Sequence, residues 1–263
     1  MDAKIFEQVL VDIVEFIKVY RQKNGEFLNL LNNIRANDIT EQDLQKLNTR
    51  WNVKEEVDNG LSIYLTSTNK LADDINCKRL LELEGNTFIN EVVIEGKFDT
   101  RSLPTHESLE FKIGAQVMLL NNEWQQRWTN GSLGKIVNII EQGEGVLTAI
   151  HVKLETGDTV VVEPFQWDLY RFFYNESTNL IDSESIGSFK QFPLKLAWAV
   201  TIHKSQGKTF DNVILDIGWG AFCHGQIYVA LSRCTSFEGI TLKQKIRRKD
   251  IWVDKRVKEL MQI

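Results

Sequence analysis

Two short polar strings near the end of the chain carry most of the information in this sequence. The first is Thr201-Ile-His-Lys-Ser-Gln-Gly207, and the second is Tyr228-Val-Ala-Leu-Ser-Arg233. Each lies beside an apolar run, and the second ends an apolar, helix-compatible stretch. Arginine suits a charge that must reach a phosphate, because its guanidinium is always protonated and its donors are forked. Strings of this kind, in this order, indicate a nucleotide-coupled site.

The sequence around the strings predicts an α/β fold. Asn212–Asp216 is typical of a buried parallel strand, residues 224–233 of a helix, and Ile240–Leu242 of another strand. Leu61–Leu65 predicts a further strand, and Thr68 or Asn69 could cap the helix after it. Apolar residues at helical spacing predict three helices, carrying Phe6, Leu10, Ile13, Phe16 and Ile17, then Phe27, Leu30, Leu31 and Ile34, then Leu71, Ile75, Leu80 and Leu83.

The middle of the chain changes character. Short β-rich segments at Gln116–Leu120, Gly134–Ile140, Leu147–Leu154 and Thr159–Val162 alternate with glycine-rich turn signals, which is typical of a small antiparallel barrel. We therefore expect one α/β domain made from residues 1–106 and 189–263, with a barrel inserted at 107–188. The polar stretch Asn175–Ser188 is interpreted as the return linker.

Composition excludes several classes of protein. The chain has 263 residues, 43% of them hydrophobic and 25% charged, as in ordinary globular proteins. The first residues hold no apolar signal core, and no run of 18 apolar residues follows, so we expect a cytoplasmic protein without a membrane segment. Cys77, Cys223 and Cys234 lie far apart without a C-x-x-C pair, which predicts small buried residues and no metal site.

The net charge of −5 argues against binding nucleic acid by bulk charge alone. Residues 243–258 hold eight basic and two acidic side chains, so this stretch carries +6 and the remainder −11. Such a run is usually a solvated face, and the functional alternative is a local surface that follows phosphates.

A phosphate-binding P-loop is absent from the sequence. Gly207-Lys208-Thr209 has the ending of such a loop, but the motif needs a glycine five residues earlier, where Ile202 stands. No other G-x-x-x-x-G-K-[ST] string occurs. Without the loop, Asp216 is interpreted as a solvated or capping residue at a strand end.

The strings resemble motifs V and VI of superfamily-one helicases of the RecD-like/Pif-type group, which moves 5′ to 3′. Phe16–Gln22 with Phe27–Arg35 resembles motif IV of that group, and Leu65–Asn69 resembles its strand-end segment that touches single-stranded DNA. Phe111–Met118 and Asn130–Gly134 resemble its inserted SH3-like subdomain. The resemblance spans nearly the whole chain in family order. It implies a second RecA-like domain, a parallel sheet flanked by helices and interrupted by the SH3-like barrel. The first RecA-like domain with Walker A and B motifs would precede Met1.

The resemblance implies roles for several residues. Arg233 resembles the motif VI arginine finger and Arg21 the motif IV arginine, both reaching the γ-phosphate across a domain cleft. A structural salt bridge is the alternative for each. Gln206 and Gly207 resemble motif V residues that face the nucleotide, although Gly207 could equally be a helix-end glycine.

A second set resembles residues that line the DNA track. Hydroxyls, amides and a lysine can hold phosphates without reading bases, which suits movement along any sequence. His203 has a satisfied core histidine as its alternative, and His106, His151 and His224 are interpreted that way. Trp124 and Trp128 could stack on bases, but packing is favoured, and we interpret the other tryptophans as packing residues: Trp51, Trp167, Trp198, Trp219 and Trp252. The implied DNA-track residues are Thr66, Asn69, Thr201, His203 and Lys204.

The sequence thus predicts the C-terminal part of an ATP-dependent 5′–3′ DNA helicase, inactive alone because it lacks a Walker A loop. ATP and Mg²⁺ are expected in the intact enzyme only. The expected partners are single-stranded DNA and the missing N-terminal RecA-like domain, with the chain itself a monomer. The alternative is a non-catalytic nucleic-acid- or partner-binding module derived from a helicase. No spaced nucleophile–base or metal constellation supports a self-contained enzyme.

Overall fold

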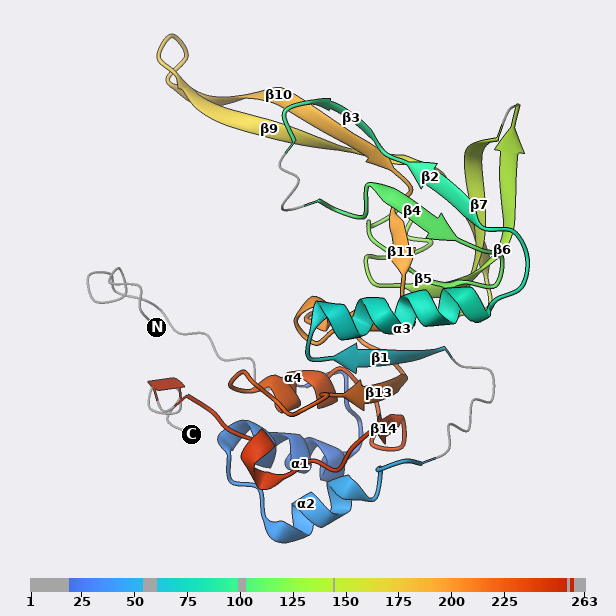
Figure 1. Ribbon diagram of the computed structural model, residues 1–263. Coiled ribbons are helices and arrows are strands. Elements are labelled where there is room, and N and C mark those ends of the chain that lie inside the picture. The colour runs from blue at the N-terminus through green and yellow to red at the C-terminus, as the bar shows by residue number, and fades with distance from the viewer. Residues whose placement is uncertain (1–18, 54–60, 99–102, 144, 255, 258–263) are drawn as a thin grey trace. The chain divides into compact units, whose positions relative to one another are not determined.

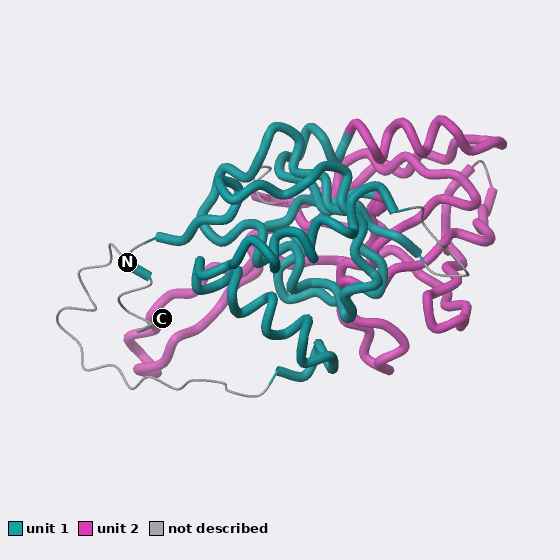
Figure 2. The backbone as a smooth tube through the Cα atoms, turned by 90° about the horizontal axis from the view of Figure 1, so that it is seen from below, with its two compact units in different colours: residues 1–73, 199–263 teal, residues 74–198 magenta. Residues whose placement is uncertain are grey.

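The computed structural model describes residues 19–53, 61–98, 103–143, 145–254 and 256–257 (Figure 1). The helix predicted from Phe6 to Ile17 lies outside these ranges. The chain divides into two compact units, which Figure 2 colours separately. Unit 1 is Met1–Asp73 with Ala199–Ile263, and unit 2 is Asp74–Trp198. The sequence-based limits of the insertion, 107 and 188, remain a proposal.

Unit 1 is built on a four-stranded parallel sheet. Its strand order is β12 (Ala199–Thr201), β1 (Ser62–Thr66), β13 (Asn212–Asp216) and β14 (Ile240–Leu242). Apolar residues of the inner strands are excluded from water, with Ile63 and Leu65 fully buried. The predicted strands at 61–65, 212–216 and 240–242 are confirmed, as is their parallel direction.

Helices with well-defined ends accompany this sheet. α1 (Gly25–Ala36) starts where the Asn24 side chain accepts hydrogen bonds from two backbone N–H groups. It buries the predicted residues Phe27, Leu30, Leu31 and Ile34, and it packs against α4 (Gln226–Leu231) (Figure 1). α2 (Glu41–Asn48) was not predicted, although Thr40 and Asp43 form a capping box at its start.

α3 (Asn69–Glu82) follows β1 and leads into unit 2. The predicted cap is confirmed at Thr68, whose hydroxyl accepts a 3.3 Å hydrogen bond from the Leu71 N–H. The described residues of this unit also include the short 3₁₀ helices η3 (His203–Ser205) and η4 (Arg248–Asp250). Among the residues that the structure describes, no helix has both the length and the apolarity that crossing a membrane requires.

Unit 2 contains a five-stranded antiparallel sheet. Its order is β11 (Leu194–Leu196), β5 (Gln116–Leu119), β6 (Leu133–Gln142), β7 (Val146–Leu154) and β8 (Thr159–Val162). Its core includes Phe111, Ile150 and Phe192, each at most 1% exposed. The four β-rich segments predicted from sequence are therefore confirmed as strands. Closure into an SH3-like barrel remains a prediction, because β11 and β8 pair only on one side within the described residues.

The segment 175–188 is not the linker that its polar composition suggested. It belongs to a hairpin of β9 (Phe165–Asn175) and β10 (Leu180–Gln191), extended by β3 (Val93–Gly96). Asn179 turns the chain with a φ of 56°. β10 holds four consecutive polar residues, Asp182–Ser185, which pair in register with β9, so backbone pairing outweighs local polarity. β2 (Phe88–Glu91) and β4 (Ser108–Phe111) form a separate two-stranded sheet.

Gly239, just before β14, lies very close to the backbone of Asp211, just before β13. A Cβ at this position would overlap the Asp211 carbonyl oxygen and lie 2.9 Å from the Cys234 sulfur. Backbone cannot move aside cheaply, so Gly239→Ala should lower the free energy of unfolding by about 2–4 kcal/mol. Circular dichroism during urea unfolding measures this change.

The matched control is Gly25→Ala, at the first position of α1, where an added Cβ meets nothing within 4 Å. That variant should be neutral or slightly stabilising, because alanine favours helix over glycine by up to about 1 kcal/mol. Equal stability of the two variants would contradict the close approach described here.

Candidate functional site

The parallel sheet brings together, at one edge, the chain segments that precede and follow unit 2 in the sequence. Thr66, at the end of β1, lies opposite Thr201 of β12 on one side and Asp216 of β13 on the other. Just beyond the strands, the Ile202 N–H donates a 2.9 Å hydrogen bond to the Thr66 carbonyl oxygen. Because parallel strands end at the same edge, the residues following β12 and β1 become neighbours there.

The residues expected to line a DNA track separate into buried and exposed ones at this edge. Thr66 is fully buried, and its hydroxyl donates a 3.0 Å hydrogen bond to the Thr68 carbonyl oxygen. Thr201 is 6% exposed, and its oxygen accepts from the Lys204 N–H at 3.4 Å. These two hydroxyls shape the turns beneath the surface. Asn69, His203 and Lys204 are exposed, and we call these three residues the carboxyl-edge row.

Gln206 and Gly207 form the corner of a tight turn after η3. Gln206 has φ −58° and ψ 138°, Gly207 has φ 79°, and the Lys208 N–H donates to the Ser205 carbonyl oxygen at 3.1 Å. These are the features of a type II turn, whose third position needs a positive φ and hence glycine. Both corner residues are exposed. The turn accounts for Gly207 by backbone geometry, while its contact with nucleotide remains a proposal.

Arg21 and Arg233 approach one another around Ser232, and we call them the arginine pair. Arg21 donates through Nη1 to the Ser232 carbonyl oxygen at 2.9 Å and through Nε to the Thr209 hydroxyl at 2.8 Å. Arg233 donates through Nη2 to the Ser232 hydroxyl at 2.9 Å and through Nε to the Val229 carbonyl oxygen at 3.0 Å. The structure thereby joins the two arginines that the sequence placed 212 positions apart.

Within the described residues, the arginine pair donates to neutral oxygens. In the described part of the chain, neither guanidinium forms an ion pair with a carboxylate. Burial, and then the charge of Arg21, lower the pKa of Arg233 from its ordinary value, although an arginine stays protonated at any physiological pH. Two partly buried cations with spare donors and no counter-charge suit an incoming anion such as a phosphate. The structural salt-bridge alternative therefore has no partner in these residues.

The sequence interpretation missed three residues that hold the arginine pair in place. Gln22 is 6% exposed, and its amide donates to the carbonyl oxygens of Ser232 and Cys234 at 3.0 and 2.9 Å. Thr209 and Ser232 accept from the guanidiniums as described. Ser232 stood inside the quoted string, but nothing local in the sequence signals that Gln22 reaches the far end of the chain.

The two groups lie at opposite edges of the sheet. Phe210 pairs with Cys234 just before β13 begins, so the arginine pair is close to the amino end of that strand. The carboxyl-edge row lies at the other end, about 17 Å away for five residues at 3.3 Å each. Residues 202–211 run from one edge to the other, and Thr209 in this segment contacts Arg21.

The tryptophans and cysteines depart in part from their expected roles. Trp128 packs in the core of unit 2 as favoured, whereas Trp124 is 83% exposed. Trp219 is fully exposed, so its interpretation as a packing residue was wrong. Cys234 is buried as predicted, but Cys77 is exposed, because it lies on the solvent side of α3.

Most cations of the basic run 243–258 have intramolecular partners. Arg247 pairs with Asp250 at 2.9 Å and Arg256 with Asp254 at 2.8 Å. Lys245 lies 4.7 Å from the centre of the Trp51 ring, and Lys243 lies 5.6 Å from that of Tyr64. Lys255 and Lys258 lie outside the described residues. These contacts favour a structural role for the run over a continuous phosphate-following surface.

Comparison with known proteins places these features in context. The family model of the UvrD-like helicase C-terminal domain matches residues 196–236. The ATP-dependent DNA helicase Pif1 of Bdellovibrio bacteriovorus is 33% identical over 231 residues, which are 84% of this chain and 48% of the relative. The PIF1 helicase of Homo sapiens is 31% identical over 90% of this chain and 36% of its own length.

Solved structures agree with the sequence relatives. A crystal structure of a double mutant of Bacteroides Pif1 helicase superposes with a TM-score of 0.85 at 34% identity, covering 99% of this chain and 58% of the other. Bacteroides Pif1 bound to ssDNA gives a TM-score of 0.71 at 35% identity, with the same coverage. The chain spans about half the length of the curated bacterial relatives it matches.

The reactivity of Cys234, the residue after Arg233, tests how tightly the chain packs next to the arginine pair. Burial raises the pKa of the Cys234 thiol to about 11, so thiolate is scarce at neutral pH, while Cys77 is exposed. At about pH 8 a thiol-specific reagent should therefore label Cys77 quickly and leave Cys234 unmodified until the protein unfolds. Stopped-flow absorbance follows the reaction. Because Cys223 is only half-buried, the comparison is made in a Cys223→Ser background, where Cys77→Ser should remove the fast phase and Cys234→Ser should keep it. The reverse pattern would contradict this packing.

Proposed function

We propose that this chain, which is homologous to the C-terminal half of Pif-type superfamily-one helicases, senses ATP with its arginine pair and guides single-stranded DNA with its carboxyl-edge row. The observation that carries the proposal is the arginine pair itself. Two guanidiniums from opposite ends of the chain meet at Ser232 without a neutralising carboxylate among the described residues. Such an arrangement suits a phosphate delivered by another domain.

The ATP-sensing part rests on charge. The triphosphate, with its Mg²⁺, supplies the transferable phosphoryl group when bound, and its charge spreads over equatorial oxygens during transfer. Arg21 and Arg233 would hold those oxygens with forked donors fixed by Thr209, Ser232 and the Val229 backbone. We propose that the grip on ATP itself comes from a first RecA-like domain, for which the greater length of the matched relatives leaves room.

The DNA-guiding part rests on the exposed residues of the edge. Lys204 offers a cation, and Asn69 and His203 offer hydrogen-bonding groups that can hold phosphate oxygens of any sequence. Thr66 and Thr201, proposed from sequence as contacts, are proposed here to position the exposed residues instead, because their hydroxyls are buried and bonded to backbone.

Coupling between the two would run through residues 202–211. This segment starts beside the carboxyl-edge row and ends beside the arginine pair, with the Gln206–Gly207 turn between them. A shift of Arg21 toward a phosphate would act on Thr209 directly and on the turn through the backbone. Gln206 and Gly207 are therefore proposed to transmit the nucleotide state.

The alternative is a non-catalytic nucleic-acid- or partner-binding module that keeps the helicase fold. The arginine pair favours the helicase, because a module that never meets ATP gains nothing from two partly buried cations that have no carboxylate partner among the described residues. We also propose a monomeric, cytoplasmic protein, in keeping with the sequence-based expectation.

ATP turnover tests the role of the arginine pair. In a protein that joins this chain to a RecA-like domain with a Walker A loop, Arg233→Ala should lower DNA-stimulated ATP hydrolysis by about 10³-fold or more. Affinity for single-stranded DNA should stay within a few-fold. A coupled phosphate-release assay and fluorescence anisotropy measure the two quantities. The chain by itself should show no DNA-stimulated hydrolysis.

Arg79→Ala is the matched control, because this arginine is exposed on α3 and, in the part of the chain that the structure describes, forms an ion pair with Glu82. Its turnover should equal that of the unsubstituted protein. Unchanged hydrolysis in Arg233→Ala would favour the non-catalytic module and overturn the ATP-sensing role.

DNA binding by the chain alone tests the carboxyl-edge row. With a net charge of −5 and only local cations at the edge, it should bind single strands weakly and lose affinity steeply as salt rises. Lys204→Ala should reduce the slope of log affinity against log salt by about 0.7, the contribution of one phosphate contact on a single strand. Tight binding that ignores salt would contradict the proposed track.

A further inference from the structure

Trp219 is exposed in a way that a packing residue would not be. Its relative accessibility is 103%, the highest among the exposed large hydrophobic residues of the described chain. Tryptophan normally buries most of its large apolar surface, so a fully exposed indole marks a place where a partner can cover it.

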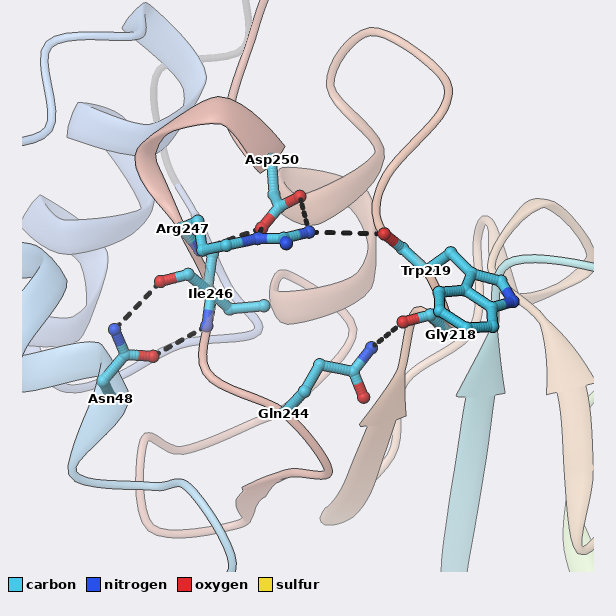
Figure 3. Close-up of polar contacts among 7 residues, drawn as sticks. All are labelled: Asn48, Gly218, Trp219, Gln244, Ile246, Arg247 and Asp250. Atoms are coloured by element: carbon cyan, nitrogen blue, oxygen red, sulfur yellow. Dashed lines mark hydrogen bonds and ion pairs between the residues drawn. The ribbon is translucent and has the colours of Figure 1, made fainter.

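The turn that carries Trp219 is held rigidly. Gly218 and Gly220 flank the indole with φ values of 56° and 139°, backbone conformations that other residues rarely adopt. The Gly218 N–H donates to the Asp216 carboxylate at 3.0 Å, and the Gln244 amide donates to the Gly218 carbonyl oxygen at 2.9 Å. Figure 3 shows the indole projecting from this turn, away from the side chains that hold its backbone.

A second set of contacts fixes the turn from the other side. Arg247 donates through Nη2 to the Trp219 carbonyl oxygen at 3.3 Å and forms a two-pronged pair with Asp250 at 2.9 and 3.0 Å. Asp250 is only 4% exposed. The neighbouring Ile246 backbone exchanges two hydrogen bonds with the Asn48 amide, as Figure 3 shows. The indole is therefore presented on an ordered support rather than on a loose loop.

The turn lies at the same edge of the sheet as the carboxyl-edge row. It follows β13, the neighbour of β1, and the Ser67 hydroxyl donates to the Ile217 carbonyl oxygen at 3.3 Å. A Cβ on Gly218 would be 3.9 Å from the Ser67 oxygen, so the turn packs against the segment that leads to Asn69. Lys243 follows β14, the next strand. Lys243 itself lies over the Tyr64 ring, so across β12, β1 and β13 the edge offers Lys204, Asn69 and Trp219 in that order.

We propose that Trp219 stacks on a base of the single strand whose phosphates the carboxyl-edge row holds. This inference rests on the proposed function and names how a base, rather than a phosphate, is engaged. An indole suits the task because every base has a π-face, so stacking is indifferent to sequence. Gln244 and Arg247 act as positioning residues, since they hold the backbone of the turn and leave the ring uncovered.

The experiment compares two single strands with the chain at low salt. One is an oligothymidylate of about 12 nucleotides, within the usual size of a single-strand site, and the other is an abasic oligomer of equal length. Trp219→Ala should weaken oligothymidylate binding about tenfold, as expected for loss of one base stack, and leave the abasic affinity unchanged. Trp219→Phe should recover most of the loss, because a phenyl ring still stacks.

Phe172→Ala is the matched control, because this aromatic residue is 71% exposed but belongs to β9 of unit 2, outside the row. It should bind both oligomers as the unsubstituted chain does. Quenching of indole fluorescence by oligothymidylate should also be smaller in Trp219→Phe than in the unsubstituted chain.

The outcomes separate this inference from the proposed function. Oligothymidylate binding that Trp219→Ala leaves unchanged, while Lys204→Ala weakens it, would overturn the stacking role and keep the track. Equal losses on both oligomers would also overturn it, since abasic DNA has no base to stack. Absence of any single-strand binding by the unsubstituted chain would overturn the track and the stacking role together.

Discussion

The backbone ladder that places β1 between β12 and β13 is the constraint on which the rest of unit 1 depends. It joins Thr66 to Thr201 on one side and to Asp216 on the other. All of unit 2 lies between β1 and β12 in the sequence. The entropy lost on closing a chain segment grows only with the logarithm of its length, so a whole insertion can be accommodated if the ladder re-forms. Fully buried Ile63 and Leu65 supply apolar stabilisation at that junction.

The ladder also explains why one segment can serve both groups of candidate residues. β12 and β13 run in the same direction, so the chain between them must return along the length of a strand. Residues 202–211 therefore begin at the carboxyl edge and end at the amino edge. The turn at Gly207, with its positive φ, sets the direction of that return. A connection between antiparallel strands would have stayed at one edge and could not have linked Lys204 with Thr209.

The sequence predicted the elements whose evidence is local. α1, β1 and β13 carry uninterrupted apolar periodicity, and the structure confirms them. The β9–β10 hairpin was missed because its strands are mostly exposed, so their stability comes from pairing with each other and not from an apolar pattern. Family resemblance indicated Arg21 and Arg233, but their meeting at Ser232 depends on Gln22, a contact across 210 positions that no local pattern encodes. Trp219 was misread because residue type alone does not say which side of a turn faces water.

The distribution of charge shows why counting cations in a sequence is a poor guide to where an anion binds. The basic run from Lys243 is the densest positive stretch of the chain, yet Arg247 and Arg256 are neutralised by carboxylates three and two positions away. Arg21 and Arg233 stand far apart in sequence. Among the described residues, they meet with only neutral oxygens as partners. Bringing two like charges together in a half-buried place costs free energy, because less water screens them. An anion that binds between them offsets this repulsion. It therefore binds more tightly than it would to an arginine whose charge a carboxylate already neutralises. Lys204, which is exposed beyond the end of β12, differs in this respect from Arg247 and Arg256, whose charges carboxylates already neutralise.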